Sequence, residues 1–325
     1  MNKQYKLLVL FLLINTSGMF GQTMLEPYWL YNNHHLTDKY IINPAFAGNQ
    51  YYPKIFIGMQ QTELHLPEAP SVHLLGAHSR LGIKKNYVNR YVANDRSARN
   101  AVGGLMFADN NGPFQTIGIK LDYAYSIPLD DKHTSLTFGL GGMLFSKRVR
   151  FSTLIDDPLI VENMGNSVMI PDFNTGLVLF HRQFYAGFSV SQLLENSYLF
   201  SKFNYTPPQV YRNFYLLAGY RLVHEIFEVE PSIAVGHNLA PASYGNNGKF
   251  IDVNVECFLK PIVFAVSYRV NGYITTSLQY RSQYMELGVR TELFSTNSTD
   301  ARLNSAALTA SYTFLPANTR RWGNN

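Results

Sequence analysis

Alternation of apolar and polar residues over long segments is the feature that most limits the fold of this chain. In residues 115–127, every second position from Ile117 to Tyr125 is apolar, and Lys120 and Asp122 stand between them. Side chains alternate faces along a β-strand, so such a segment has one apolar and one polar face. The pattern recurs in residues 135–140, 228–235, 251–257, 274–280, 285–293 and 307–314. The sequence therefore predicts an all-β fold.

The length and number of the predicted strands favour a membrane barrel over a soluble sandwich, which would also alternate. Most segments have the length of roughly 9–11 residues that a tilted strand needs to cross a bilayer. An even number of strands leaves both ends of a barrel on the periplasmic side, as in bacterial barrels. We predict fourteen antiparallel strands, at residues 53–63, 70–80, 101–109, 115–127, 133–146, 173–181, 183–191, 213–222, 226–237, 249–259, 261–270, 273–281, 284–294 and 306–314.

The predicted connections alternate in length along the chain. Those after the fourth, sixth, eighth, tenth and twelfth strands are short, whereas those at 147–172, 192–212, 238–248 and 295–305 are long. Short periplasmic turns and long outer loops are typical of outer-membrane barrels. Two outer connections, 110–114 and 271–272, are short, and 81–100 is long where a short turn is expected. This basic insertion is either a solvated loop or a surface for anionic groups or a periplasmic partner.

The N-terminus has the features of a secretory signal peptide. Lys3 and Lys6 precede the apolar run 7–14, and small residues lead to a predicted cleavage site after Gly21. The run is shorter than the roughly 20 residues of a transmembrane helix. We therefore divide the chain into a signal peptide (1–21), an N-terminal periplasmic or plug segment (22–52), a β-barrel (53–314) and a C-terminal tail (315–325).

Composition agrees with an exported barrel. Charged residues form 15% of the chain and aromatic residues 14%, whereas a typical soluble domain has about 25% charged residues. The net charge of +5 is too small to predict nucleic-acid binding. The single cysteine, Cys257, has no partner for an internal disulfide. A closed barrel can instead be held by its ladder of backbone hydrogen bonds.

The polar face of the strands carries charges of both signs. Such a lumen is either a water-filled pore or one that is braced by ion pairs and plugged. We find no pattern that predicts a catalytic, cofactor-binding or metal site, so a non-enzymatic protein without cofactors is expected. The charges predicted to face the lumen are Lys120, Asp122, Arg221, Glu228, Glu230, Asp252, Glu256, Arg269, Arg281, Glu286, Arg290 and Glu292.

Residues 41–48, with the sequence IINPAFAG, lie between the signal peptide and the first strand. Pro44 biases Asn43 towards an extended backbone, Phe46 supplies an apolar anchor and Gly48 permits a positive φ. The segment is either an entry turn into the first strand or a plug that docks in the periplasmic mouth and helps to engage a partner. We take Asn43, Pro44, Ala45, Phe46 and Gly48 as the candidate partner-binding or plug motif.

This motif resembles the hallmark of the PorP/SprF family, membrane proteins of the Bacteroidetes type IX secretion system. The likeness continues in order through Gly103–Asp109, Leu121–Tyr125, Phe184–Ser189, Tyr215–Tyr220 and Val266–Arg269. The chain departs from the family pattern at 60–64, where a Trp-containing basic stretch is missing, and in the basic insertion and the tail.

The resemblance implies a non-enzymatic outer-membrane protein that partners a secreted cargo. Family members are thought to engage the C-terminal sorting domain of large adhesins, often in gliding or attachment, and to aid export or surface anchoring. Other secretion components and outer-membrane lipid are the further partners that it implies, and nucleic acid is not one of them. Two rival classes remain, namely a channel or porin-like transporter, which needs an open lumen, and a barrel enzyme, which needs a Ser/His pair at the outer rim.

Overall fold

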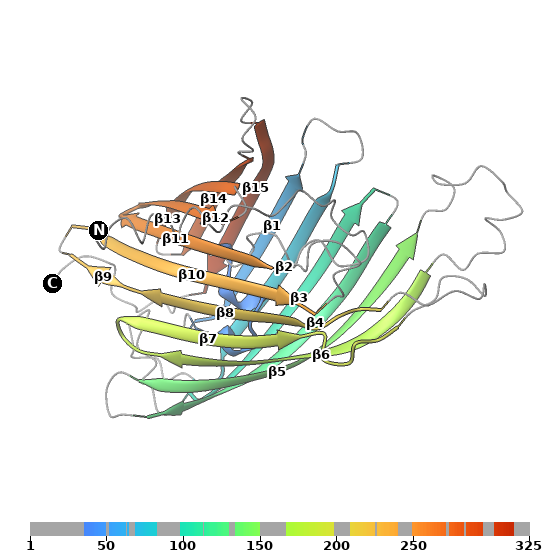
Figure 1. The fold of residues 1–325 in the computed structure, drawn as a ribbon. Coiled ribbons are helices and arrows are strands. Elements are labelled where there is room, and N and C mark those ends of the chain that lie inside the picture. The colour runs from blue at the N-terminus through green and yellow to red at the C-terminus, as the bar shows by residue number, and fades with distance from the viewer. Residues whose placement is uncertain are drawn as a thin grey trace, which may run out of the picture.

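A computed structural model shows an antiparallel β-barrel with a short segment inside it (Figure 1). The structure describes residues 36–49, 52–62, 64, 69–82, 98–112, 114–129, 134–149, 167–197, 209–224, 226–239, 249–270, 273–282, 284–294 and 302–314. The predicted signal peptide and C-terminal tail lie outside these residues, as does most of the basic insertion. Among the described residues, no helix has the length and hydropathy that crossing a membrane requires.

The strands pair with their sequence neighbours around the whole ring. The bounds are β1 (Lys54–Thr62), β2 (Ser71–Arg80), β3 (Asn100–Asn111), β4 (Phe114–Pro128), β5 (Ser135–Val149), β6 (Ser167–Phe180), β7 (Phe184–Ser191), β8 (Asn213–Tyr220), β9 (Leu222–Val223), β10 (Glu228–Asn238), β11 (Phe250–Leu259), β12 (Ile262–Arg269), β13 (Tyr273–Arg281), β14 (Met285–Phe294) and β15 (Arg302–Thr313).

Pairing of the first and last strands closes the barrel. Lys54 at the start of β1 lies opposite Thr313 at the end of β15, and Thr62 lies opposite Ser305. β9 continues the course of β8 beside β10 after a break at Arg221, so the two form one wall position. The prediction of an all-β barrel with fourteen antiparallel strands is confirmed, because this arrangement has fourteen positions.

The hairpin of β5 and β6 is longer than the sequence predicts. Pairing continues to Arg148 and Ser167, beyond the predicted strand ends at 146 and 173. Pro171 obscured the pattern, since proline is excluded from central strands. It is tolerated here because β7 pairs with β6 only between Thr175 and Phe180, so Pro171 lies where no β7 residue pairs with it.

The two faces of the barrel have opposite polarity. On β4, 66% of Leu121 is exposed on the outer face, whereas only 5% of the neighbouring Asp122 is exposed. Exposed Ile, Leu, Val, Phe and Tyr side chains cover the outside of the other strands as well, and many buried side chains are polar. A soluble protein buries its apolar residues and exposes its polar ones. Apolar residues outside and polar residues inside are expected of a barrel surrounded by lipid.

The two ends of the barrel differ in their connections. At one end β1 begins, β15 ends and short turns join β4 to β5, β6 to β7 and β11 to β12; we name it the short-turn rim. At the other end lie the connections at 150–166 and 192–212, and we name it the long-loop rim. The parity rule for bacterial barrels places the short-turn rim in the periplasm.

Candidate functional site

Residues 36–49 lie inside the barrel and form the lumen segment (Figure 1). The segment contains two single-turn 3-10 helices, η3 (Lys39–Ile41) and η4 (Pro44–Phe46). Asp38 caps η3 by accepting a hydrogen bond from the Tyr40 amide, and Asn43 caps η4 by accepting one from the Ala45 amide. Pro44 fits the first position of its turn because a helix leaves that amide without a partner in any case. The local sequence thus sets two turns in succession.

Asn43 ties the segment to the wall as well as to its own turn. Its side-chain nitrogen donates to the carbonyl oxygen of Phe188 on β7 at 3.2 Å. The hydroxyl of Ser189 donates to the Ile42 carbonyl at 2.8 Å. Only 1% of Asn43 is exposed, so an apolar replacement would leave buried backbone groups without partners.

Glycines in adjacent strands make room for the η4 turn. A Cβ atom on Gly139 of β5 would lie 2.3 Å from the Ala45 nitrogen, and one on Gly176 of β6 would lie 2.1 Å from the Asn43 side-chain oxygen. Glycine in a strand interior often marks a place where another backbone approaches closely. Glycine at these two strand positions leaves room for the motif, and any larger side chain would clash with it.

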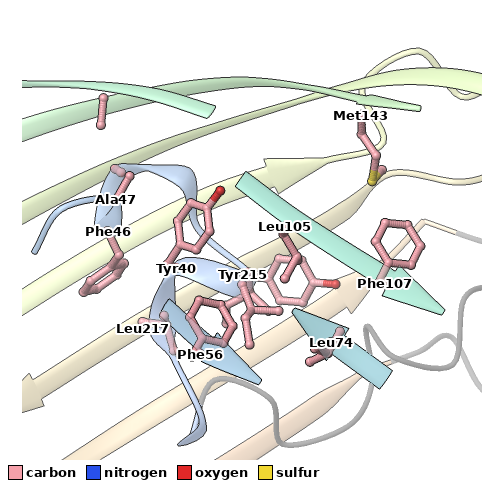
Figure 2. Packing of buried hydrophobic residues seen from close by; sticks show 14 of the residues in the cluster. Tyr40, Phe46, Ala47, Phe56, Leu74, Leu105, Phe107, Met143, Tyr215 and Leu217 are labelled. Atoms are coloured by element: carbon pink, nitrogen blue, oxygen red, sulfur yellow. The ribbon is translucent and has the colours of Figure 1, made fainter. Parts of the chain in front are cut away.

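Phe46 is the apolar anchor of the segment. Its ring packs edge-on against Phe180 at 5.2 Å and Tyr185 at 5.7 Å between ring centroids. Such aromatic pairs add to the stabilisation that comes from burial alone. Phe46 and Ala47 lie together on the ribbon of the lumen segment in Figure 2, and 1% of each is exposed.

Tyr40 and two charges on β4 form a second attachment. The Tyr40 hydroxyl donates to Asp122 at 2.6 Å. The Lys120 ammonium donates to the carbonyl oxygens of Tyr40 and Ile41 at 3.2 and 3.1 Å and lies 3.2 Å from Asp122. The predicted inward charges on β4 therefore bind the lumen segment as well as each other.

A buried cluster joins both ends of the segment to β1 and β2. Asp38 lies 3.0 Å from the Lys54 ammonium and 3.2 Å from the His78 Nε2 atom. The His78 Nδ1 atom accepts a hydrogen bond from the Gly48 amide, and the Arg80 guanidinium donates to the Gly48 carbonyl. Gly48 has a φ of 65°, which glycine adopts readily. Burial raises the pKa of Asp38, but the charge of Lys54 and the hydrogen bonds from His78 and the Tyr40 amide outweigh it and hold the pKa well below its ordinary range.

The opposite side of the segment meets charged side chains. Lys39 lies 3.2 Å from Glu230 of β10, and its ammonium lies over the Tyr185 ring. Arg290 of β14 donates to the Thr37 hydroxyl at 3.2 Å. Contacts therefore reach the segment from β1, β2, β4, β6, β7, β10 and β14, which surround the lumen.

The lumen has two different walls. Inward residues of β2 to β7 include Leu74, Leu105 and Phe107, which belong to one buried cluster (Figure 2), beside the Lys120–Asp122 pair; we name this side the apolar wall. Inward residues of β10 to β14 include the pairs Arg269–Asp252 at 2.7 Å and Arg281–Glu286 at 2.9 Å; we name this side the charged wall. Of the two states of the lumen left open by the sequence, the described residues match the one braced by ion pairs.

The five motif residues act together in space. Asn43, Pro44, Ala45 and Phe46 meet β5, β6 and β7, while Gly48 meets β2. Sequence reasoning missed Asp38, Tyr40, His78 and Lys39 as members of the same assembly. The inward parity of Lys120 and Asp122 was visible in the sequence, but their partners lie some 80 positions away, which alternation cannot reveal. Among the described residues, no group of three or more His, Cys, Asp or Glu side chains is placed to hold a metal ion.

Comparison with known proteins supplies a family for this arrangement. The family model described as "Type IX secretion system membrane protein PorP/SprF" matches residues 28–312. Among curated proteins, no relative matches the chain.

Solved structures with a similar fold are barrels. The CymD monoaromatic hydrocarbon channel has a TM-score of 0.50 and 12% identity, covering 87% of this chain and 94% of that one. The toluene transporter TodX of Pseudomonas putida has a TM-score of 0.45 and 10% identity, covering 87% and 93%. At such identities, CymD supports the barrel fold alone.

Proposed function

We propose that this chain, which belongs to the PorP/SprF family of type IX secretion system membrane proteins, is an internally plugged barrel that partners a secreted cargo. The cargo is an adhesin-like protein recognised through its C-terminal sorting domain, and the barrel aids its export or its anchoring at the cell surface. The chain is an outer-membrane protein, and we expect it to act by binding rather than by catalysis.

The lumen segment is the observation that supports this role over transport. A channel needs a continuous aqueous path, whereas residues 36–49 contact β1, β4, β7 and β10 on different sides of the lumen. The motif that carries the family resemblance also sits at the centre of this segment. We infer that the segment forms a rigid collar at the short-turn rim, on which a periplasmic partner can assemble. The alternative, a porin-like transporter, is compatible with the barrel fold and requires the segment to leave the lumen.

The test is a Pro44→Ala, Phe46→Ala, Gly48→Ala triple variant expressed in the native host. Assembly is scored by heat-modifiability on gels, and cargo by immunolabelling of intact cells. Phe107→Ala is the matched control, because it removes a buried lumen ring from β3 away from the motif. Normal assembly with lost cargo display in the triple variant alone supports the proposal.

Normal assembly with normal cargo display would contradict a role for the segment. If the triple variant does not assemble, the single Phe46→Ala variant replaces it, because this change creates space without straining the backbone.

A further inference from the structure

The described part of the short-turn rim carries a net positive charge. Among the described residues of its connections, Arg99, Arg182 and Lys260 are basic and none is acidic. The described residues of the long-loop connections include Glu195, Arg212 and Lys249, so this rim shows no comparable excess. The described part of the short-turn rim therefore favours anionic ligands.

A cavity of about 140 Å³ opens beside the lumen segment at the short-turn rim. Lys39, Phe46 and Asn49 of the segment line one side, and the β6–β7 turn at 181–183 lines another. We name this cavity the vestibule. It belongs to the lumen side of the wall, so membrane lipid on the outer face does not reach it directly.

Aromatic rings and cations alternate in the vestibule. The Phe46 ring makes edge-on contacts with the rings of Phe180 and Tyr185. The Lys39 ammonium lies 5.0 Å from the centre of the Tyr185 ring. On the other side, the Arg281 guanidinium lies 5.0 Å from the centre of the Phe258 ring. These surfaces suit a ligand that joins an apolar or aromatic group to an anionic one.

Most vestibule cations already have carboxylate partners. Arg221 pairs with Glu228 and Glu230, Lys39 with Glu230, and Arg281 with Glu286. Arg182, in the β6–β7 turn, is exposed and has no ion-pair partner among the described residues. Its guanidinium is therefore available to a carboxylate, which arginine can bind with two hydrogen bonds.

We propose that the vestibule binds the carboxylate-bearing end of a periplasmic polypeptide, with an apolar or aromatic last side chain against the rings. The kind of partner rests on the proposed function, and the inference adds which chemical group of that partner the vestibule binds. The small volume suits one side chain with its carboxylate rather than a folded domain. Capture of a terminal carboxylate is an established mode of peptide recognition.

The test uses the full-length protein in detergent and two fluorescent decapeptides that end in phenylalanine, one with a free carboxylate and one amidated. We expect the free acid to bind at least tenfold more tightly, measured by anisotropy. Arg182→Ala should weaken its binding at least fivefold, and raised salt should weaken it as well. The matched control is Arg148→Ala, an exposed arginine near the long-loop rim, which should leave binding unchanged.

Equal affinity for the two peptides, absence of binding, or an equal effect of Arg148→Ala would overturn the proposal. Binding of anionic phospholipid vesicles that depends on Arg182, without binding of either peptide, would assign the site to a lipid headgroup instead. The outcome is separable from that of the proposed function. Loss of the carboxylate preference with normal dependence of cargo display on Phe46 would refute the vestibule alone.

Discussion

The apolar wall and the charged wall hold the same short segment by different physical means. Towards β5, β6 and β7, the η4 turn fits against glycines and aromatic rings, and buried hydrogen bonds join it to β7, so contact depends mainly on shape. Towards β10 and β14, single polar links bridge the segment to Glu230 and Arg290. Close packing tolerates little change in volume, whereas an ion pair at a partly exposed site adjusts and is screened by salt. We infer that the apolar wall positions the segment and that the charged wall steadies it.

The largest effect should come from filling the space on the apolar wall. Gly139→Ala places a Cβ atom 2.3 Å from the Ala45 backbone nitrogen, which cannot shift as a flexible side chain would. We expect the lumen segment to move away from β5. A cysteine introduced at Thr37 in a Cys257→Ala background should then become reactive to maleimide. Gly142→Ala, on the same strand, meets its nearest atom at 3.8 Å and serves as the control. Unchanged labelling in both variants would argue against a shape-defined seat.

Removal of the anchor ring should have the next largest effect. Phe46→Ala deletes a fully buried side chain, a change that typically costs roughly 3–5 kcal/mol. The measurement is the free energy of urea unfolding of the barrel in lipid, with maleimide labelling at position 37 to follow the segment. A loss below about 1 kcal/mol in the free energy of unfolding would show that Phe46 contributes little to holding the segment in place.

The charged wall should respond less. Lys39→Met removes one charged hydrogen bond, worth roughly 1.5–3 kcal/mol, and Glu230 keeps Arg221 as a partner. Because the Lys39 side chain is partly exposed, this loss is expected towards the lower end and should shrink in high salt. A larger loss than that of Phe46→Ala, in the same unfolding assay, would reverse the order of the two walls.

The smallest effect near neutral pH concerns Asp38. Its pKa is depressed below its ordinary value of 3.8, so its contribution to stability is complete above that value and declines as the pH falls below it. Segment seating should therefore be constant between about pH 8 and pH 5 as far as Asp38 is concerned, and should weaken only below about pH 4. Asp38→Asn should remove that acid-side decline, which labelling at position 37 across a pH series would show. An identical acid profile in the variant would exclude Asp38 as its cause.

Alternation predicted the barrel because each strand has to separate lipid from lumen residue by residue. Leu121 and Asp122 show this directly, since they are neighbours in sequence and lie on opposite faces. The extension of β6 past Pro171 was missed, because proline looks like a boundary unless the unpaired edge of β6 is known. The fit of Asn43 between its own turn and β7 was also beyond the sequence, since it joins residues 145 positions apart. The Asn-Pro turn itself could be predicted from the sequence, but its contacts with the barrel wall could not.

The most direct test of a plugged barrel is the conductance of the purified full-length protein in planar lipid bilayers. We expect no stable open-pore current for the native chain, and a current that appears in Gly139→Ala but not in Gly142→Ala. A steady open-pore current from the native protein, unchanged by either substitution, would contradict a lumen segment that closes the barrel and would favour a channel.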